Sequence, residues 1–274
     1  MDLRDKVVMV HGGTSGIGKE LVLTLVSKKA NVVFTGTNKQ KGKEVIELLN
    51  NLYKGKRSHH AHFYNMDITD WRAQENIYDF IENVYTGKKI DIVIIVAGIL
   101  DSSNLMDDLE ERGGGGYHYH TLEVNLTAAV KANRLAIQYF LKEKRPGCII
   151  NTSSVFGLAP GPTQPLYAAS KHAIIGLTKS YGSLLRSTNI RVNVIAPHFV
   201  ETALVPKESI KAVQTFGMVS LKSCIEAFLY VIADESLNGR SVEPRFYDPV
   251  VEQLDYMCQK RKEDVLNLIL KHFQ

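Results

Sequence analysis

A tyrosine and a lysine stand four residues apart in the segment Tyr167-Ala-Ala-Ser-Lys171. The apolar residues that follow favour a helix, and residues four apart lie on one helix face with Cβ atoms about 5 to 6 Å apart. An ammonium beside a phenol favours the phenolate, so we expect the pKa of Tyr167 to lie below its ordinary value of about 10. Such a phenol can act as a general acid or base. The alternative is a chance pairing at a common spacing.

A glycine-rich turn follows the first β-branched run of the chain, residues 7–10. Gly12 and Gly16 can adopt backbone angles denied to other residues, and Gly18 lets the following helix approach the sheet. The exposed N–H groups and positive dipole end of that helix suit a pyrophosphate. The turn therefore predicts a dinucleotide site, with an ordinary turn as the alternative. Its candidate contacts are Gly12, Thr14, Ser15, Gly16, Ile17 and Gly18.

Three more polar positions belong with these two motifs. Ser154 follows the run 148–152, and ligands of open α/β sheets bind outside the carboxyl ends of the strands. Asn125 is expected in mid-helix, where an amide has no propensity advantage. The run 190–195 leads into Pro197-His-Phe-Val-Glu-Thr202, which offers backbone groups and a hydroxyl to an amide-bearing ligand.

Alternating strands and helices must position these residues. The β-branched runs are separated by segments with helical apolar spacing, and nearly continuous apolar runs indicate strands buried on both faces. We predict one doubly wound, Rossmann-type α/β domain over 1–274, with a parallel sheet of about seven strands flanked by helices. Its core spans about 5–245, and a C-terminal helix extends over about 249–272. The expected strands are 7–10, 31–34, 60–65, 91–96, 148–152, 190–195 and 241–246.

Composition excludes several classes of protein. The 274 residues are 45% hydrophobic and 23% charged, which excludes a disordered chain. The longest apolar run, 92–100, is far shorter than the roughly 20 residues of a membrane span. The net charge of +4 is dispersed, so we expect no nucleic-acid partner. The amino-terminal residues lack a signal pattern and three distant cysteines suggest no disulfide, so we expect a cytoplasmic protein that contacts no membrane.

The combined motifs resemble the short-chain dehydrogenase/reductase family over about residues 5–245. The resemblance implies that Tyr167 acts as acid/base on the substrate oxygen, Ser154 holds that oxygen, and Lys171 binds the nicotinamide ribose and depresses the Tyr167 pKa. It implies that Asn125 holds a water in the proton relay to Lys171. It also implies cofactor contacts at Asp67 and Ile68 for the adenine, Ala97 and Gly98 for the ribose, and Pro197, Val200 and Thr202 around the carboxamide.

Within that family the chain is most similar to the branch containing 15-hydroxyprostaglandin dehydrogenase and the insect alcohol dehydrogenases. This similarity implies a small-molecule secondary alcohol or ketone as substrate, and the apolar loop after Thr202 suits an apolar ligand. The expected substrate contacts are Gln164, His198 and Leu204. Small and apolar residues on several helix faces predict a homodimer or homotetramer. These residues are Ala128, Ala132, Ala136, Ala173, Ile174 and Leu177.

The cofactor choice depends on the end of the second expected strand. An acidic residue there would accept the ribose hydroxyls and repel a 2′-phosphate, but none is present. Thr37, Asn38 and Lys39 can donate to a phosphate, although no arginine is available for a bidentate contact. We therefore expect NADP(H) to be favoured over NAD(H).

The chain departs from the family pattern at His11, at Ile95-Val96 and at His198. We interpret His198 as shaping the pocket rather than as a second acid or base. The other histidines lack matching ligand spacing, so we predict no metal. The leading hypothesis is an NAD(P)-dependent oxidoreductase that interconverts a secondary alcohol and a ketone. The alternative is a dinucleotide-binding protein with little catalysis and a structural, storage or sensing role.

Overall fold

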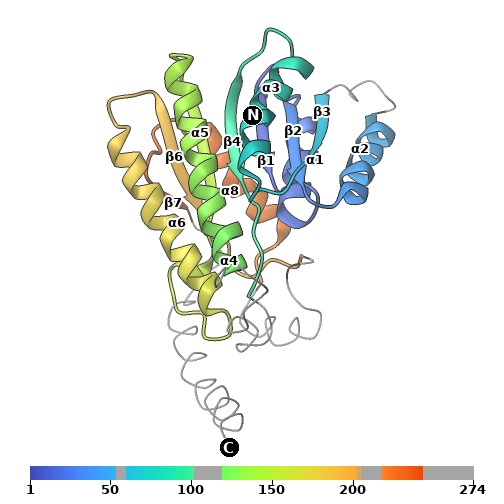
Figure 1. The fold of residues 1–274 in the computed structure, drawn as a ribbon. Helices are drawn as coiled ribbons and strands as arrows, with labels where there is room; N and C mark the ends of the chain where they lie inside the picture. The colour runs from blue at the N-terminus through green and yellow to red at the C-terminus, as the bar shows by residue number, and fades with distance from the viewer. Residues whose placement is uncertain (54–59, 102–118, 203, 205–217, 243–274) are drawn as a thin grey trace, which may run out of the picture.

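Seven parallel strands form the centre of the computed structural model, which describes residues 1–53, 60–101, 119–202, 204 and 218–242 (Figure 1). Their order across the sheet is β3-β2-β1-β4-β5-β6-β7, and every neighbouring pair is parallel. The order reverses beside β1, which pairs with both β2 and β4. The strands are β1 (Val7–His11), β2 (Asn31–Gly36), β3 (Ala61–Asn65), β4 (Ile90–Ile95), β5 (Gly147–Thr152), β6 (Ile190–Ile195) and β7 (Ser241–Val242).

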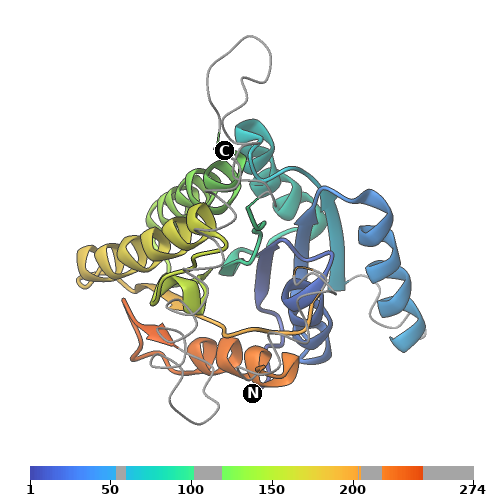
Figure 2. The same cartoon turned by 90° about the horizontal axis from the view of Figure 1, so that it is seen from below.

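Helices cover both faces of this sheet, and Figure 2 shows α5 and α6 on one side with α1 and α8 on the other. Successive strand residues point to opposite faces, so Val8 and Val10 pack under α1, α2 and α8, whereas Val7 and Met9 pack under α3, α5 and α6. The helical segments are α1 (Gly16–Ser27), α2 (Lys39–Tyr53), α3 (Trp71–Val84), α4 (His120–Leu122), η3 (Glu123–Thr127), α5 (Ala128–Lys142), η4 (Val155–Gly157), α6 (Pro165–Leu184) and α8 (Leu221–Ala233).

The structure confirms the predicted doubly wound sheet and the positions of its strands. β7 is described only as Ser241–Val242, so the remainder of the expected strand 241–246 lies outside the described residues. The expected C-terminal helix over 249–272 also lies outside them. Among the helices that the structure describes, none combines the length and apolar character needed to cross a bilayer.

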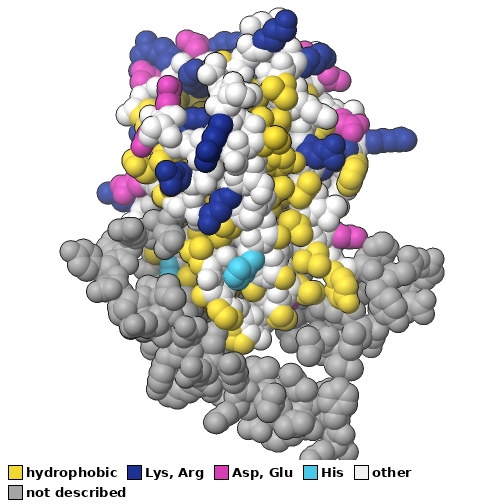
Figure 3. Space-filling view, turned by 90° about the vertical axis from the view of Figure 1, so that its left-hand side faces the viewer, with side chains coloured by type: hydrophobic (Ala, Val, Ile, Leu, Met, Phe, Trp, Pro, Cys, Tyr) yellow, Lys and Arg dark blue, Asp and Glu magenta, His cyan; other side chains and the backbone are white. Residues whose placement is uncertain are grey.

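The small residues that predicted an oligomer are largely used inside the chain. Ala128, Ala132, Ala136 and Ile174 are buried in the core between the sheet and the helices α5 and α6. The side of the molecule that carries α6 shows a band of apolar side chains between scattered lysines and arginines (Figure 3). Leu184 at the end of α6 is 71% exposed. Burial within the chain explains the alanines, and the oligomer stays a prediction.

Candidate active site

The glycine-rich turn between β1 and α1 has a backbone conformation and a close packing that require glycine. Gly12 and Gly16 have φ angles of 93° and 51°, the left-handed region that favours glycine. A Cβ on Gly12 would lie 2.6 Å from the Ala97 backbone nitrogen, and a Cβ on Gly18 would overlap the Gly12 carbonyl oxygen. These close approaches explain the glycines at both positions, and they bring the turn against the end of β4.

The amino end of α1 is open to an anion. Ser15 is its N-cap residue but makes no side-chain capping hydrogen bond, and the first turn contains no acidic residue. Thr14 packs closely against Gly36 at the end of β2, where a Cβ on Gly36 would lie 2.7 Å from the Thr14 hydroxyl oxygen. The open N–H groups and the positive end of the helix dipole fit a dinucleotide pyrophosphate.

The loop after β2 presents exposed polar groups at the expected adenosine side. Thr37, Asn38 and Lys39 are all exposed, and Lys39 begins α2. The Oδ1 of Asn38 accepts a hydrogen bond of 2.9 Å from the Lys41 N–H and thereby caps α2. The Asn65 amide donates to the Thr37 carbonyl at 3.1 Å and holds the loop. The Asn38 amide nitrogen, Thr37 hydroxyl and Lys39 ammonium therefore remain as donors for a phosphate.

The loop after β3 is stabilised by its own side chains. The Asp67 carboxylate accepts from the Thr69 N–H and hydroxyl, both at 2.8 Å, while Ile68 is buried. Gln74, a residue that the sequence analysis did not single out, donates from its amide to the carbonyls of Ile68 and Ala128. The available signal in the sequence was a polar residue at the helical spacing of the apolar residues Ile77 and Ile81, which are buried with it on α3.

Ser154, Tyr167 and Lys171 come together in a buried group. Ser154 lies just beyond β5, and its hydroxyl is hydrogen-bonded to Tyr167 on α6. Lys171 lies one turn further along α6, with its Nζ 5.4 Å from the centre of the Tyr167 ring, and donates to the Thr152 carbonyl at 2.9 Å. Ser154, Tyr167 and Lys171 are 9%, 7% and 3% exposed. The structure thus joins the Tyr167–Lys171 pair to Ser154, which lies 13 residues earlier in the chain.

The expected lowering of the Tyr167 pKa is wrong, because the pKa is raised in the folded protein. Burial raises the pKa of Tyr167, the Ser154 hydrogen bond opposes that rise, and the Asp101 carboxylate adds to it. Burial also lowers the pKa of Lys171 to about 8, because its ammonium is removed from water. Desolvation is therefore the largest cause of both pKa shifts.

Asn125 lies in mid-helix as expected, in the π-helical segment η3 between α4 and α5. Its side chain accepts from the Ile99 N–H and donates to the Ile99 carbonyl, both at 2.8 Å, and it also donates to the Ser170 hydroxyl at 3.3 Å. A Cβ on Gly98 would lie 3.2 Å from the Asn125 Oδ1 and 3.3 Å from the Lys171 Nζ. The wider turn thus places the amide between the loop after β4 and the helix α6.

The segment after β6 closes the other side of the glycine-rich turn. Pro197 and Val200 are buried, and Val200 forms a β-bridge with Val219. A Cβ on Gly16 would lie 3.2 Å from the Cβ of Thr202. Thr202 therefore lies directly against the turn, and its expected contact with the carboxamide stays a prediction.

The three expected substrate contacts have different environments. The His198 ring packs edge-on against Phe199, with ring centres 4.9 Å apart, and Phe199 in turn contacts Phe156, two residues beyond Ser154. Leu204 is 42% exposed. The Gln164 side-chain oxygen accepts a hydrogen bond of 2.6 Å from the Asp101 N–H, so this oxygen has a structural partner.

The departures at His11 and Ile95-Val96 are accommodated by the protein core. His11 is buried, its Nδ1 lies 3.5 Å from the Thr35 hydroxyl, and burial lowers its pKa to about 4, so the ring is neutral at pH 7. Ile95 and Val96 pack into the cores on the two faces of the sheet. Within the described ranges, no three histidine, cysteine, aspartate or glutamate side chains are grouped as a metal site would require.

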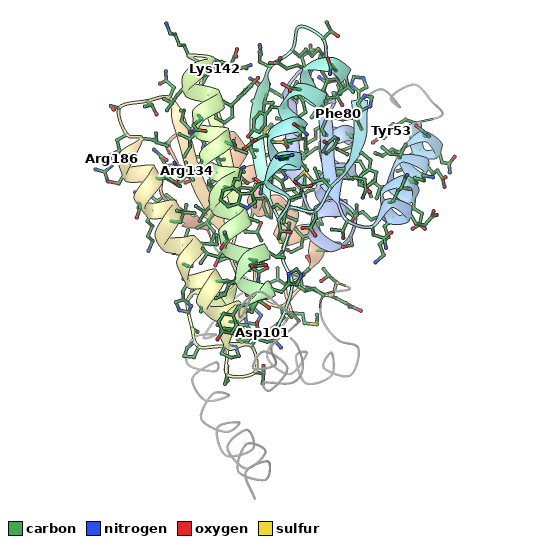
Figure 4. The ribbon with its side chains drawn as sticks, viewed as in Figure 1. Tyr53, Phe80, Asp101, Arg134, Lys142 and Arg186 are labelled. Carbon is green, nitrogen blue, oxygen red and sulfur yellow. The ribbon has the colours of Figure 1, made fainter. Side chains whose placement is uncertain are left out.

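Asp101 is a site residue that the sequence analysis did not assign. It follows the loop after β4 and lies at the end of α6 where that helix begins, whereas Arg186 lies beyond the far end of the helix (Figure 4). Its two carboxylate oxygens accept from the backbone N–H groups of Leu166 and Tyr167. These partners are 65 and 66 residues away along the chain, so local sequence pattern carried no signal for the contact.

Comparisons with known proteins agree with this geometry. The family model described as short chain dehydrogenase matches residues 6–212. The 3-oxoacyl-(acyl-carrier-protein) reductase of Thermotoga maritima is 32% identical over 246 residues, which cover 86% of this chain and 94% of that protein. The 15-hydroxyprostaglandin dehydrogenase (NAD⁺) of Mus musculus is 28% identical over 258 residues, covering 87% of this chain and 89% of that protein.

A solved structure of similar fold is described as ElxO with NADP bound. It superimposes with a TM-score of 0.73 at 22% identity, covering 87% of this chain and 96% of that one. This likeness supports the doubly wound fold.

Proposed function

Because the chain belongs to the short-chain dehydrogenase/reductase family, we propose that it interconverts a secondary alcohol and a ketone on an apolar small molecule, using NAD(P). The coarser function, an oxidoreductase of this family, follows from the family itself. The observation that carries the finer proposal is the buried group in which Tyr167 is hydrogen-bonded to Ser154 and lies one helical turn from Lys171. This group provides an acid/base, an oxygen ligand and a cation in one buried cluster of side chains.

The chain's own residues supply proton transfer and orientation. The bound dinucleotide supplies the acceptor or donor of the hydride at the carbinol carbon. In the oxidative direction Tyr167 takes the proton from the substrate hydroxyl, and in the reductive direction it returns a proton to the carbonyl oxygen. Ser154 donates a hydrogen bond to the same oxygen. Lys171 keeps a positive charge beside the phenol, and the burial of all three side chains excludes water from the proton transfer.

NADP(H) is the cofactor that we propose is favoured. The exposed donors of Thr37, Asn38 and Lys39 support this choice, and no acidic side chain stands among them to repel a 2′-phosphate. The solved relative with NADP supports it, whereas the mouse relative is named for NAD⁺. Dissociation constants for NADP⁺ and NAD⁺, measured side by side by calorimetry, test the preference, and tighter binding of NAD⁺ would overturn it.

The experiment that tests the mechanism is Tyr167→Phe. The substrates are secondary alcohols from 2-propanol to 2-decanol and the matching ketones, with absorbance of the reduced nicotinamide as the readout. We expect the variant to keep its cofactor affinity and to lose about 10²- to 10⁴-fold or more in turnover, because acid/base catalysis is removed. Tyr181→Phe is the control, since it makes the same change on the same helix α6. Unchanged turnover in Tyr167→Phe would contradict the mechanism.

The alternative of a dinucleotide-binding protein with little catalysis loses its structural motivation. His11 and Ile95 are buried, Val96 is partly buried against the core, and His198 packs on an aromatic ring. If the wild-type protein turned over none of the alcohols and ketones but bound the cofactor tightly, that result would nevertheless favour the alternative.

The assembly and the position within the family also belong to this proposal. We propose a homodimer or homotetramer, supported by the apolar band beside α6 (Figure 3). Light scattering that finds only a monomer would refute it. The likeness to the branch of 15-hydroxyprostaglandin dehydrogenase is supported by the mouse relative and stays a prediction, as does the cytoplasmic location.

A further inference from the structure

The helix that carries Tyr167 and Lys171 is capped by a carboxylate from another part of the chain. Asp101 accepts from the Leu166 N–H at 2.9 Å with one oxygen and from the Tyr167 N–H at 2.7 Å with the other. In return, the Asp101 N–H donates to the Gln164 side chain at 2.6 Å. The loop after β4 and the amino end of α6 are thus joined by three hydrogen bonds.

The ordinary local solution is missing at this helix end. Gln164 is the N-cap residue of α6 but makes no side-chain capping bond, and Pro165 at the first helical position has no N–H to satisfy. The next two N–H groups are the ones that Asp101 accepts. Hydrogen bonds from backbone donors to a carboxylate are stronger than neutral ones, and a negative charge is favourable at a helix amino end. Asp101 therefore determines where the first turn of α6 lies relative to the sheet.

We propose that Asp101 is a positioning residue for catalysis, which holds the backbone of Tyr167 so that its hydroxyl meets Ser154 and the substrate oxygen. The inference rests on the proposed function of Tyr167 as acid/base. It concerns a direct bond to the backbone of the reacting residue, so a displacement of this contact moves the phenol itself. A misplacement of about 1 Å can cost about 10²-fold in rate.

Asp101 also acts on the charge of the phenol. Three groups act on Tyr167 among the described residues, and each comes from a different segment: Ser154 after β5, Lys171 from α6 and Asp101 after β4. Burial raises the Tyr167 pKa most, the Ser154 hydrogen bond lowers it, and the Asp101 charge raises it further. Replacing the carboxylate by an amide removes that last contribution, so the pKa of Tyr167 should fall in Asp101→Asn.

The test compares Asp101→Asn and Asp101→Ala with the wild type, using NADP⁺ and 2-octanol. We expect kcat to fall by about 10²-fold in Asp101→Ala, with a smaller loss in Asp101→Asn because its amide oxygen can still accept one N–H. The KM for NADP⁺ should stay within about twofold, because the two backbone groups that donate to the Asp101 carboxylate belong to α6 and not to the glycine-rich turn. The midpoint of the pH–rate profile should move to lower pH in Asp101→Asn.

Asp70 provides a matched control. As the local N-cap residue of α3, it accepts from the N–H groups of Arg72 and Ala73 with one carboxylate oxygen. It thus also binds two backbone donors, but on a helix that carries no catalytic residue. Asp70→Asn and Asp70→Ala should lower the free energy of unfolding without changing kcat or the pH–rate midpoint. If the Asp101 variants behave like the Asp70 variants, Asp101 is only a structural cap and the proposal is wrong.

A measurement without turnover separates this inference from the proposed function. The tyrosinate absorbance of wild type minus Tyr167→Phe, followed against pH with NADP⁺ bound, isolates the titration of Tyr167. The same difference between Asp101→Asn and the double variant Asp101→Asn/Tyr167→Phe should titrate at lower pH. An inactive wild type would contradict the proposed function, whereas an unchanged tyrosinate titration would contradict the role of Asp101.

Discussion

Replacing Lys171 by methionine tests how strongly burial lowers the pKa of this lysine. Lys171 is 3% exposed, and burial lowers its pKa from 10.5 to about 8 in the cofactor-free protein. Its pKa returns to the ordinary value when the chain unfolds, so between pH 8 and 10.5 the unfolded state binds more protons than the folded state. The free energy of unfolding must therefore rise with pH across this window. At about 1.4 kcal/mol per pH unit, the whole difference corresponds to about 3 kcal/mol.

Methionine has a similar length and does not titrate, so Lys171→Met should lack this rise. From the two pKa values, the wild type should gain about 1 kcal/mol over the variant between pH 7 and pH 9, and the rest at higher pH. Urea denaturation of both proteins without cofactor, at several pH values, measures this difference directly. The comparison uses the change with pH, because the lost hydrogen bond to the Thr152 carbonyl adds its own contribution.

Lys179→Met is the control, since Lys179 is an exposed lysine on the same helix. Its stability difference from the wild type should be nearly constant between pH 7 and pH 9. A constant difference for Lys171→Met as well would show that Lys171 keeps its ordinary pKa in the fold. That result would refute the conclusion that desolvation controls the charges of the site.

Two further predictions concern the cofactor side of the crevice. Gly18→Ala should weaken NADP⁺ binding and destabilise the protein, because its Cβ would overlap the Gly12 carbonyl oxygen, whereas Gly176→Ala on α6 meets nothing within 4 Å and should be neutral or stabilising. Calorimetry and urea denaturation measure both effects, and equal behaviour of the two variants would contradict the close packing of the turn. Lys39→Glu should lower the affinity for NADP⁺ by about tenfold and leave NAD⁺ binding nearly unchanged, while Lys41→Glu should do neither. Equal losses for both cofactors would show that Lys39 does not meet the 2′-phosphate.

Hydrophobic pattern and glycine placement were sufficient to predict the fold. Continuous apolar runs such as the one in β1 indicate strands buried on both faces, and such runs are visible in the sequence itself. The left-handed angles of Gly12 and Gly16 agree with the glycine requirement that the turn implied. Spacing also predicted that Tyr167 and Lys171 share one helix face, since helix geometry alone decides this.

The position of Asn125 and the use of Gln164 required the tertiary structure. In a π-helical turn the backbone hydrogen bonds join residues five apart rather than four. Here the turn carries Asn125, which is hydrogen-bonded to Ile99 at a separation of 26 residues. Gln164 was expected to contact the substrate, which stays a prediction, and the structure adds a hydrogen bond that its side-chain oxygen accepts from the Asp101 N–H. Such partners lie far apart along the chain, so no local window contains both.

The sequence by itself determined the doubly wound sheet, the glycine-rich turn and the identities of the proposed acid/base, its serine partner and its lysine. The sheet, the turn and the Tyr167–Lys171 pair follow from residue type and short-range spacing, whereas the roles of the acid/base, its serine partner and its lysine follow from the resemblance to the family. Only the tertiary structure decided the directions of the Tyr167 and Lys171 pKa shifts and the capping of α6 by Asp101. Both depend on desolvation and on contacts between distant segments, and those quantities exist only once the chain has folded.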